Sequence, residues 1–154
     1  MLKANSQAAS QRLLDNLPLT IQGEGFFDVV RDEEHPFKVI TDNIATTALG
    51  TSFNIRAYEG NPNIQVSLAT GKVKVENNFD QNLLEIVPGE AVYYSEDKNT
   101  FEKQNVNLSN VLSWKEGILQ FEKTPFNLII EDLERWYGVE IKVAGDKKLP
   151  EYKC

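Results

Sequence analysis

The fold class is decided by two short stretches of sequence, Phe53-Asn54-Ile55-Arg56-Ala57 and Ile64-Gln65-Val66-Ser67-Leu68. In each stretch apolar and polar side chains alternate, which is the period of a β-strand. The residues between them, Glu59-Gly60-Asn61-Pro62-Asn63, favour a turn. This pattern predicts strands of a sheet with one face against a core and the other in water.

The same period extends outward over residues 19–121, for example in Phe37-Lys38-Val39 and Val73-Lys74-Val75. Glycines that precede alternating stretches are spaced unevenly along this region, at Gly25, Gly50, Gly71, Gly89 and Gly117. Glycine is suited to chain reversals because it adopts positive φ without steric cost. We therefore predict a mainly β domain over residues 1–106, a twisted stack of short strands that is either solenoid-like or sandwich-like.

The pattern changes after residue 106. Residues 107–117 are polar and predict a connector with one helical turn. Residues 118–154 then read as strand, helix, strand: Ile118–Phe121, a helix over Thr124–Tyr137, and Val139–Val143. The helix prediction rests on Thr124 as N-cap, Pro125 in the first turn and Gly138 at the C-terminal end. Its apolar face is expected to comprise Phe126, Ile129, Ile130, Leu133 and Trp136.

Composition restricts the function classes. The 154 residues carry 23 acidic and 16 basic side chains, a net charge of −7, which argues against binding to nucleic acid or to anionic lipid. No apolar run is long enough to span a membrane, and the first residues lack the apolar core of a signal peptide. We expect any targeting element to lie outside this chain. The single cysteine, Cys154, excludes an internal disulfide.

No group of residues predicts an enzyme. His35 is the only histidine, so a histidine metal site or a catalytic triad cannot be assembled, and we interpret it as a structural residue before Pro36. The acidic run Asp32-Glu33-Glu34 lacks calcium-loop spacing and is typical of a solvated loop. Gly23-Glu24-Gly25 lacks the third glycine and following helix of a nucleotide-binding motif. We expect no catalytic residue, no cofactor and no metal.

Candidate partner-binding residues lie in the C-terminal region. Tyr137 is one position off the apolar helix face, and exposed tyrosines are favoured in protein interfaces. Trp114 lies at the boundary between the two regions. Val139 and Ile141 belong to the second predicted strand, whose open edge would accept another strand. We therefore expect the strand–helix–strand unit either to dock on the β domain near Trp114 or to pair with a second chain as a homo-oligomer.

An ordered series of segments resembles the FecR-type anti-sigma regulators and covers nearly the whole chain. The segments are Gly23–Val29, His35–Val39, Leu49–Tyr58, Gly71–Val75, Val87–Glu90, Ser113–Gly117 and the helix that starts at Thr124-Pro125 and ends at Trp136-Tyr137-Gly138-Val139. The C-terminal unit resembles the first half of the small STN-like α/β domain that ends many members.

The resemblance implies a function and a location. FecR-type regulators combine a cytoplasmic anti-sigma segment, one inner-membrane helix and a periplasmic region. The periplasmic region senses the signalling domain of a TonB-dependent outer-membrane transporter, and the signal reaches an extracytoplasmic-function sigma factor. The expectation is therefore a periplasmic, non-enzymatic sensing domain that contacts the sigma factor only through a segment outside this chain.

Two other function classes remain at this point. The first is a carbohydrate- or ligand-binding β domain of an exported protein, which needs exposed aromatic side chains on one face. Two adjacent pairs, Phe26-Phe27 and Tyr93-Tyr94, place one aromatic of each pair outward. The second is a glycosidase with two catalytic carboxylates, for which the chain offers only acidic residues.

Overall fold

The computed structural model describes residues 18–144 apart from residues 62, 81 and 123. The chain divides into two compact units, residues 1–111 and residues 112–154. Within the described residues, all ten strands belong to the first unit, and the one long helix belongs to the second.

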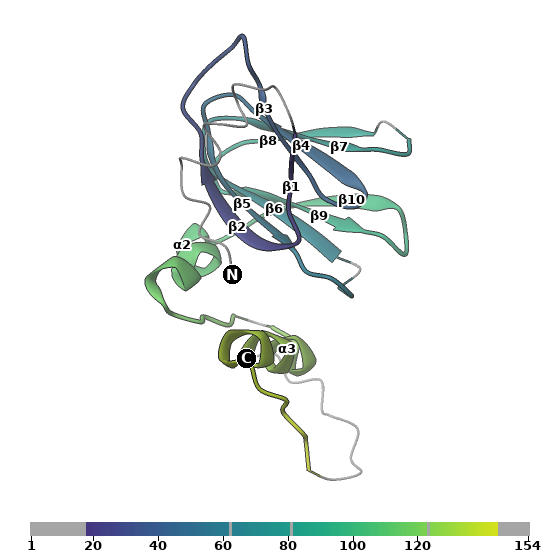
Figure 1. The fold of residues 1–154 in the computed structure, drawn as a ribbon, viewed down its shortest axis with the longest axis vertical. Coiled ribbons are helices and arrows are strands. Elements are labelled where there is room, and N and C mark those ends of the chain that lie inside the picture. Colours follow the sequence, from purple (N-terminus) through teal and green to yellow (C-terminus); the bar gives the residue numbers. More distant parts are fainter. Residues whose placement is uncertain (1–17, 62, 81, 123, 145–154) are drawn as a thin grey trace. The chain divides into compact units, whose positions relative to one another are not determined.

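The strands of the N-terminal unit form two five-stranded sheets (Figure 1). Sheet A has the order β1 (Leu19–Thr20), β3 (Phe37–Ile40), β4 (Ile44–Ala48), β7 (Val73–Asn77) and β8 (Leu83–Ile86). Sheet B has the order β10 (Thr100–Asn105), β9 (Glu90–Ser95), β6 (Asn63–Thr70), β5 (Ser52–Ala57) and β2 (Gly23–Asp28). All neighbouring strands are antiparallel except β1 and β3. The predicted mainly β fold is confirmed.

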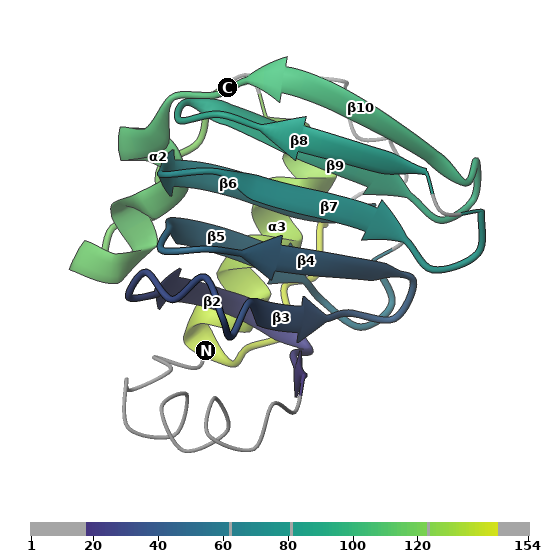
Figure 2. The same cartoon turned by 90° about the horizontal axis from the view of Figure 1, so that it is seen from above.

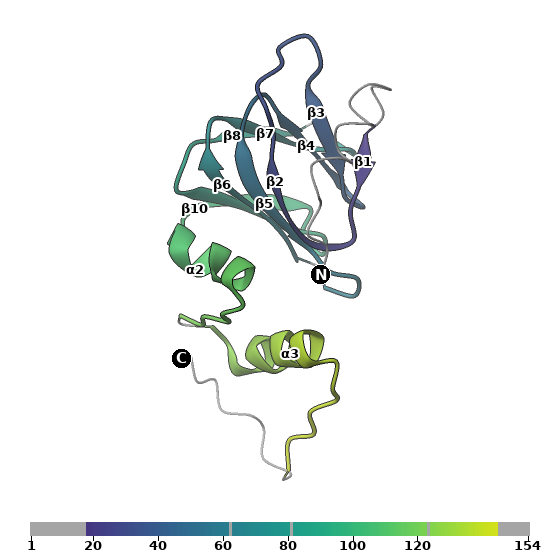
Figure 3. The same cartoon turned by 60° about the vertical axis from the view of Figure 1, so that its left-hand side comes forward.

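The chain builds the two sheets alternately, one hairpin at a time. The hairpin β3–β4 lies in sheet A, β5–β6 in sheet B, β7–β8 in sheet A and β9–β10 in sheet B. Figure 2 and Figure 3 show the resulting two layers, with the hairpins following one another in the same direction. The structure is therefore a sandwich, although the chain advances through it in regular steps, as in a solenoid.

Glycines stand where the chain crosses between the sheets. Gly50 joins β4 to β5 and Gly71 joins β6 to β7, both at positive φ, 67° and 82°. A Cβ on Gly71 would lie 2.6 Å from Cγ2 of Thr51 and 2.8 Å from the carbonyl oxygen of Gly50. The two crossings are thus packed against each other, and side chains are excluded from them by contact as well as by backbone conformation. Gly25, in contrast, lies inside β2 and does not form such a turn.

One apolar core fills the space between the sheets. Phe27 of sheet B lies 5.8 Å from Phe37 of sheet A, measured between ring centroids, and 5.1 Å from Phe53 of its own sheet. The members of the core are Ile21, Phe27, Phe37, Val39, Ile44, Ala48, Phe53, Ile55, Ala57, Ile64, Val66, Leu68, Val73, Val75, Ile86, Val92 and Tyr94. Apart from Ile21, which lies between β1 and β2, they are inward-facing strand residues, and their burial is the main stabilising contribution to this unit.

Hydrogen bonds join hairpin turns of the two sheets at one end of the sandwich. Asn99, in the β9–β10 turn, accepts bonds at Oδ1 from Asn77 Nδ2 (2.7 Å) and from the Tyr94 hydroxyl (2.8 Å). Asn43, in the β3–β4 turn, donates from Nδ2 to Glu96 Oε1 at 2.7 Å. These bonds tie the end of sheet A to the end of sheet B, so the sandwich is closed by polar contacts there.

The chain leaves β10 through helical turns. Helix α2 (Leu108–Leu112) runs across the boundary between the units and leads into the 3-10 helix η1 (Ser113–Glu116). Helix α3 (Phe126–Tyr137) is the main element of the C-terminal unit and ends at Gly138, whose φ of 66° is left-handed. The predicted connector turn, the helix and its glycine end are confirmed.

Two details of the predicted C-terminal unit were wrong. Residues 118–121 and 139–143 are all described, and neither stretch forms a strand. Alternation alone does not make a strand, because a two-stranded pair without further strands is marginal. The second error concerns Thr124: the N-cap is Pro125, and the Thr124 hydroxyl donates to the Glu122 carbonyl at 3.4 Å instead of capping α3.

Candidate protein-binding site

The candidate site lies at the C-terminal end of α3 and in the segment that follows it. Tyr137, the last residue of α3, is 67% exposed, and Val139 is 51% exposed. Ile141 is half-buried, and Val143 is exposed again. Three of the four predicted residues, Tyr137, Val139 and Ile141, are neighbours in the sequence, and two of them, Tyr137 and Val139, are exposed.

Glu134 holds this stretch against the end of the helix. Its backbone carbonyl accepts bonds from the N–H groups of Gly138 (2.8 Å) and Val139 (3.2 Å). Its carboxylate Oε1 accepts the N–H of Ile141 at 2.7 Å. A single residue thus receives three backbone donors, which fixes the course of the chain after α3.

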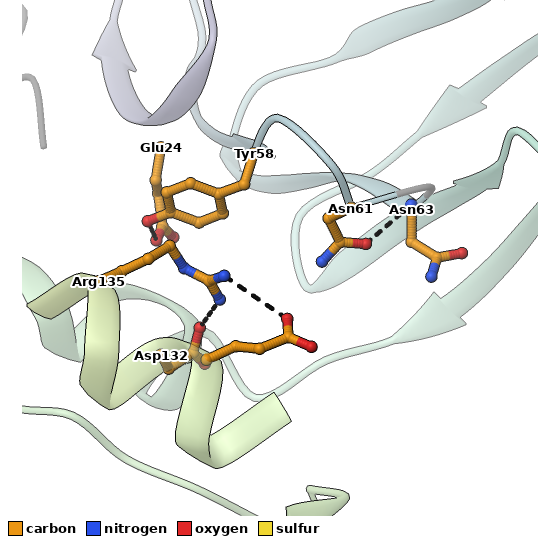
Figure 4. A network of polar contacts seen from close by, with 7 residues as sticks. Glu24, Tyr58, Asn61, Asn63, Asp132 and Arg135 are labelled. Carbon is orange, nitrogen blue, oxygen red and sulfur yellow. Dashed lines mark hydrogen bonds and ion pairs between the residues drawn. The ribbon is translucent and has the colours of Figure 1, made fainter. Parts of the chain in front are cut away.

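The charges of the last two turns of α3 explain why a glutamate is tolerated there. Carboxylates near a helix C-terminus are opposed by the helix dipole. Arg135 offsets this by forming ion pairs with Glu131 (Nη1–Oε2, 3.6 Å) and with Asp132 (Figure 4). Glu134 is compensated by the backbone N–H of Ile141.

Trp114, the fourth predicted residue, is placed differently. It lies in η1, and only 7% of its surface is exposed. Its indole Nε1 is buried and has no hydrogen-bond partner among the described residues. Trp114 is therefore buried rather than exposed, and a direct role for it in partner binding stays a prediction.

The helix leaves part of its apolar face uncovered. Ile129 is buried, whereas Ile130, Leu133 and Trp136 are half-buried. Phe126 at the start of the helix is 36% exposed, and Ile118 before it is 56% exposed. Exposed apolar residues on a small unit are typical of an interaction surface.

Sheet B of the N-terminal unit carries a buried carboxylate on its outer face. Glu24 of β2 is 8% exposed and accepts bonds from Asn54 Nδ2 (2.9 Å) and from the Tyr58 hydroxyl (3.0 Å; Figure 4). The Arg56 guanidinium lies 5.4 Å from the centroid of the Tyr58 ring. Because these donors satisfy the carboxylate of Glu24, we interpret the cluster as structural: it stabilises the pairing of β2 with β5.

The acidic loop before β3 is organised internally. Asp32 accepts bonds from the backbone N–H groups of Glu34 (3.0 Å) and His35 (3.2 Å), and its Oδ2 lies 3.0 Å from Nδ1 of His35. The side-chain bond to His35 is the main reason that the pKa of Asp32 is lowered. Among the described residues, no three histidine, cysteine or acidic side chains gather in an arrangement that could hold a metal ion.

The adjacent aromatic pairs divide as their alternation requires. Phe27 and Tyr94 are buried in the core, and Phe26 and Tyr93 are half-buried on the outer face of sheet B. Burial raises the pKa of Tyr93. By the strand register, Phe26 is in the same transverse row as Asn54, while Tyr93 is in the row of Arg56. The two outward aromatics therefore belong to different rows and lie towards opposite edges of sheet B.

No helix within residues 18–144, where the structure describes them, combines the length and the apolar character of a membrane span.

Two family models match the chain in sequence order. The model described as FecR protein matches residues 1–74, and the model described as FecR, C-terminal matches residues 118–154. Together the matches cover more than half of the chain. The chain belongs to the FecR family. No curated protein matches it.

This FecR-family chain is similar to two solved structures that share one description. A 1.65 Å crystal structure of "a putative anti-sigma factor" from Parabacteroides distasonis has a TM-score of 0.80 and 34% identity, over 88% of this chain and 63% of that one. A 2.50 Å structure with the same description has a TM-score of 0.71 and 36% identity, over 77% of this chain and 55% of that one. The chain thus spans less than two thirds of these relatives. The likeness supports a regulatory role.

Proposed function

We propose that this FecR-family chain is the sensing part of an anti-sigma regulator. The observation that carries the proposal is the ordered match of both FecR models, one to the β region and one to the region of α3. The similarity to a structure described as an anti-sigma factor supports it. The β-sandwich supplies a rigid body, and the C-terminal unit supplies exposed apolar residues suited to contact another protein.

In the finer form of the proposal, the chain lies in the periplasm as part of a single-pass inner-membrane protein. Its partner is the signalling domain of a TonB-dependent outer-membrane transporter. Binding of that domain changes the state of the regulator, and a cytoplasmic segment outside this chain passes the signal to an extracytoplasmic-function sigma factor. The net charge of −7 is consistent with a protein partner and not with nucleic acid or anionic lipid.

The contact with the transporter domain is proposed to centre on Tyr137 and Val139. Both are exposed: Tyr137 is the last residue of α3, and Val139 follows two residues later, with its backbone N–H bonded to the Glu134 carbonyl. A tyrosine on a pre-ordered segment loses little conformational entropy on binding, which is why such residues contribute strongly to interfaces.

Calorimetric titration with the signalling domains of transporters encoded near this gene tests the proposal. Tyr137→Ala is expected to weaken binding by about 30-fold, since interface hot spots contribute about 2 kcal/mol or more. Phe79→Ala is the matched control, because Phe79 is an aromatic of similar exposure, 72%, in the N-terminal unit, and it should bind like the unaltered chain.

The result that overturns the proposal is the absence of binding to every such domain. Binding to oligosaccharides on a glycan array, lost when Phe26 or Tyr93 is replaced, would instead favour a carbohydrate-binding domain.

A further inference from the structure

The segment after α3 has a self-complementary sequence. Val139-Glu140-Ile141-Lys142-Val143 places apolar residues at positions one, three and five, with a negative charge at position two and a positive charge at position four. Read in the opposite direction, the pattern of apolar residues is unchanged and the two charges exchange places. Such a segment is complementary to an antiparallel copy of itself.

We propose that this chain forms a homodimer in which Val139–Val143 pairs with the same segment of a second copy, antiparallel about a two-fold axis at Ile141. In this register Glu140 lies opposite the partner's Lys142, and Lys142 lies opposite the partner's Glu140. Val139 lies opposite the partner's Val143. Both cross-strand charge pairs are attractive, and the other face of the ribbon is entirely apolar.

The charges specify this register over its neighbours. If the two-fold axis lies at Glu140 instead, Glu140 is opposite the partner's Glu140. If it lies at Lys142, Lys142 is opposite the partner's Lys142. Like charges in direct opposition are unfavourable. A shift of one residue sets apolar side chains against charged ones and mixes the two faces. Among the registers that keep most of the segment paired, the one centred on Ile141 therefore satisfies both the charge and the apolar patterns.

The structure leaves the segment available for such pairing. The side chains of Glu140 and Lys142 are 75% and 81% exposed, and Lys142 Nζ lies 3.5 Å from Glu140 Oε1 of its own chain. Within the described residues, the backbone N–H groups of Glu140 and Lys142 make no hydrogen bond. The N–H of Ile141 is bound to Glu134.

These backbone contacts are consistent with an extended segment Val139–Val143 that has one edge available for pairing. Successive N–H groups of a strand point to opposite edges. If the edge of Ile141 faces Glu134, the opposite edge presents the N–H and carbonyl groups of Glu140 and Lys142. In an antiparallel ribbon where Ile141 and the partner's Ile141 form a non-hydrogen-bonded pair, the backbone groups of Glu140 and Lys142 bond to the partner. Dimer formation therefore leaves the bond between Ile141 and Glu134 intact.

Charge reversal tests the proposal with a built-in rescue. Lys142→Glu and Glu140→Lys each turn both attractive pairs into repulsive ones, so each variant alone should dimerise at least about tenfold more weakly. An equimolar mixture of the two variants restores both attractive pairs and should form a heterodimer. The double variant Glu140→Lys/Lys142→Glu has the unaltered composition and should dimerise like the unaltered chain.

Sedimentation equilibrium over a concentration series provides the measurement, against the chain mass of 17.4 kDa. The proposal is overturned if the unaltered chain stays monomeric up to about 1 mM, where even a weak pair associates. It is equally overturned if a dimer forms and the single charge reversals leave it unchanged, because the dimer then uses another surface. A mixture of the two single variants that stays monomeric also contradicts it.

Disulfide trapping gives an independent geometric readout. In a Cys154→Ser background, Ile141→Cys should cross-link with its own copy under mild oxidation, because opposite residues of a non-hydrogen-bonded pair lie about 4.5 Å apart at Cα. Val143→Cys is the matched control and should not cross-link, since its two copies are at opposite ends of the ribbon. Efficient cross-linking of Val143→Cys, with none for Ile141→Cys, contradicts the register. Neither readout depends on the transporter partner.

Discussion

Replacement of Gly71 by alanine tests whether the sheet crossings are packed against each other. Gly71 has a φ of 82°, and an added Cβ would lie 2.6 Å from Thr51 Cγ2 and 2.8 Å from the Gly50 carbonyl oxygen. The left-handed backbone costs about 1–2 kcal/mol for an L-residue, and overpacking a tight site adds about 1–3 kcal/mol. Gly71→Ala is therefore expected to destabilise the chain by about 2–5 kcal/mol.

Gly60→Ala is the matched control, since Gly60 has a φ of 76° and nothing within 4 Å of the added Cβ. It should lose only the backbone contribution, about 1–2 kcal/mol. Urea unfolding followed by circular dichroism gives both values, because the free energy of unfolding falls linearly with urea concentration.

The closest contact of the added methyl group can be removed separately. Thr51→Ser deletes Cγ2 and should recover part of the loss in a Gly71→Ala background, which a double-mutant cycle measures. If Gly60→Ala and Gly71→Ala lost the same free energy of unfolding, the crossings would not be in close contact and the packing argument would be refuted.

Three further predictions concern single side chains. Ile129→Ala should destabilise the C-terminal unit by about 2 kcal/mol or more because Ile129 is its buried helix residue, while Asn127→Asp, exposed in the first turn, should be neutral or stabilising; tryptophan fluorescence melts check both, and equal effects would contradict the assigned face. His35→Ala should raise the lowered pKa of Asp32 towards its ordinary 3.8. Because the pKa of Asp32 is lowered in the folded chain, this carboxylate stabilises the fold at pH values above 3.8, and the stabilisation is lost as the pH falls through the lowered pKa. A carbon-13 NMR titration of Asp32 that is unchanged in the variant would contradict this. Thr46→Val should stabilise the sandwich by about 1 kcal/mol, because the buried Thr46 Oγ1 has no partner among the described residues; a loss in thermal melts would point to an unseen hydrogen bond.

Alternation in the sequence predicted the strands whose two faces differ most. Residues 53–57 and 64–68 match β5 and β6 closely. β10 offers little such signal, because it is an edge strand in which Phe101 alone packs towards the core. The choice between a solenoid and a sandwich depends on which hairpins share a sheet, and that information resides in contacts between distant residues such as Phe27 and Phe37.

The exposure of the candidate residues was predicted in part. The position of Tyr137 just off the apolar helix face indicated its exposure correctly. The burial of Trp114 could not be read from sequence, because the connector gives no periodicity there. The role of Glu134 was missed, although a carboxylate opposed to the helix dipole was a signal that it has a bonding partner.

Hydrogen exchange of the chain with and without a transporter signalling domain tests the proposed sensory role most directly. Backbone amides exchange more slowly where a partner covers or orders the chain. At a chain concentration low enough to keep the protein monomeric, the account predicts that saturation with the partner protects residues 137–143 and leaves the strands of both sheets unchanged. Unchanged exchange over residues 137–143 at saturation, or new protection confined to the N-terminal unit, would contradict it.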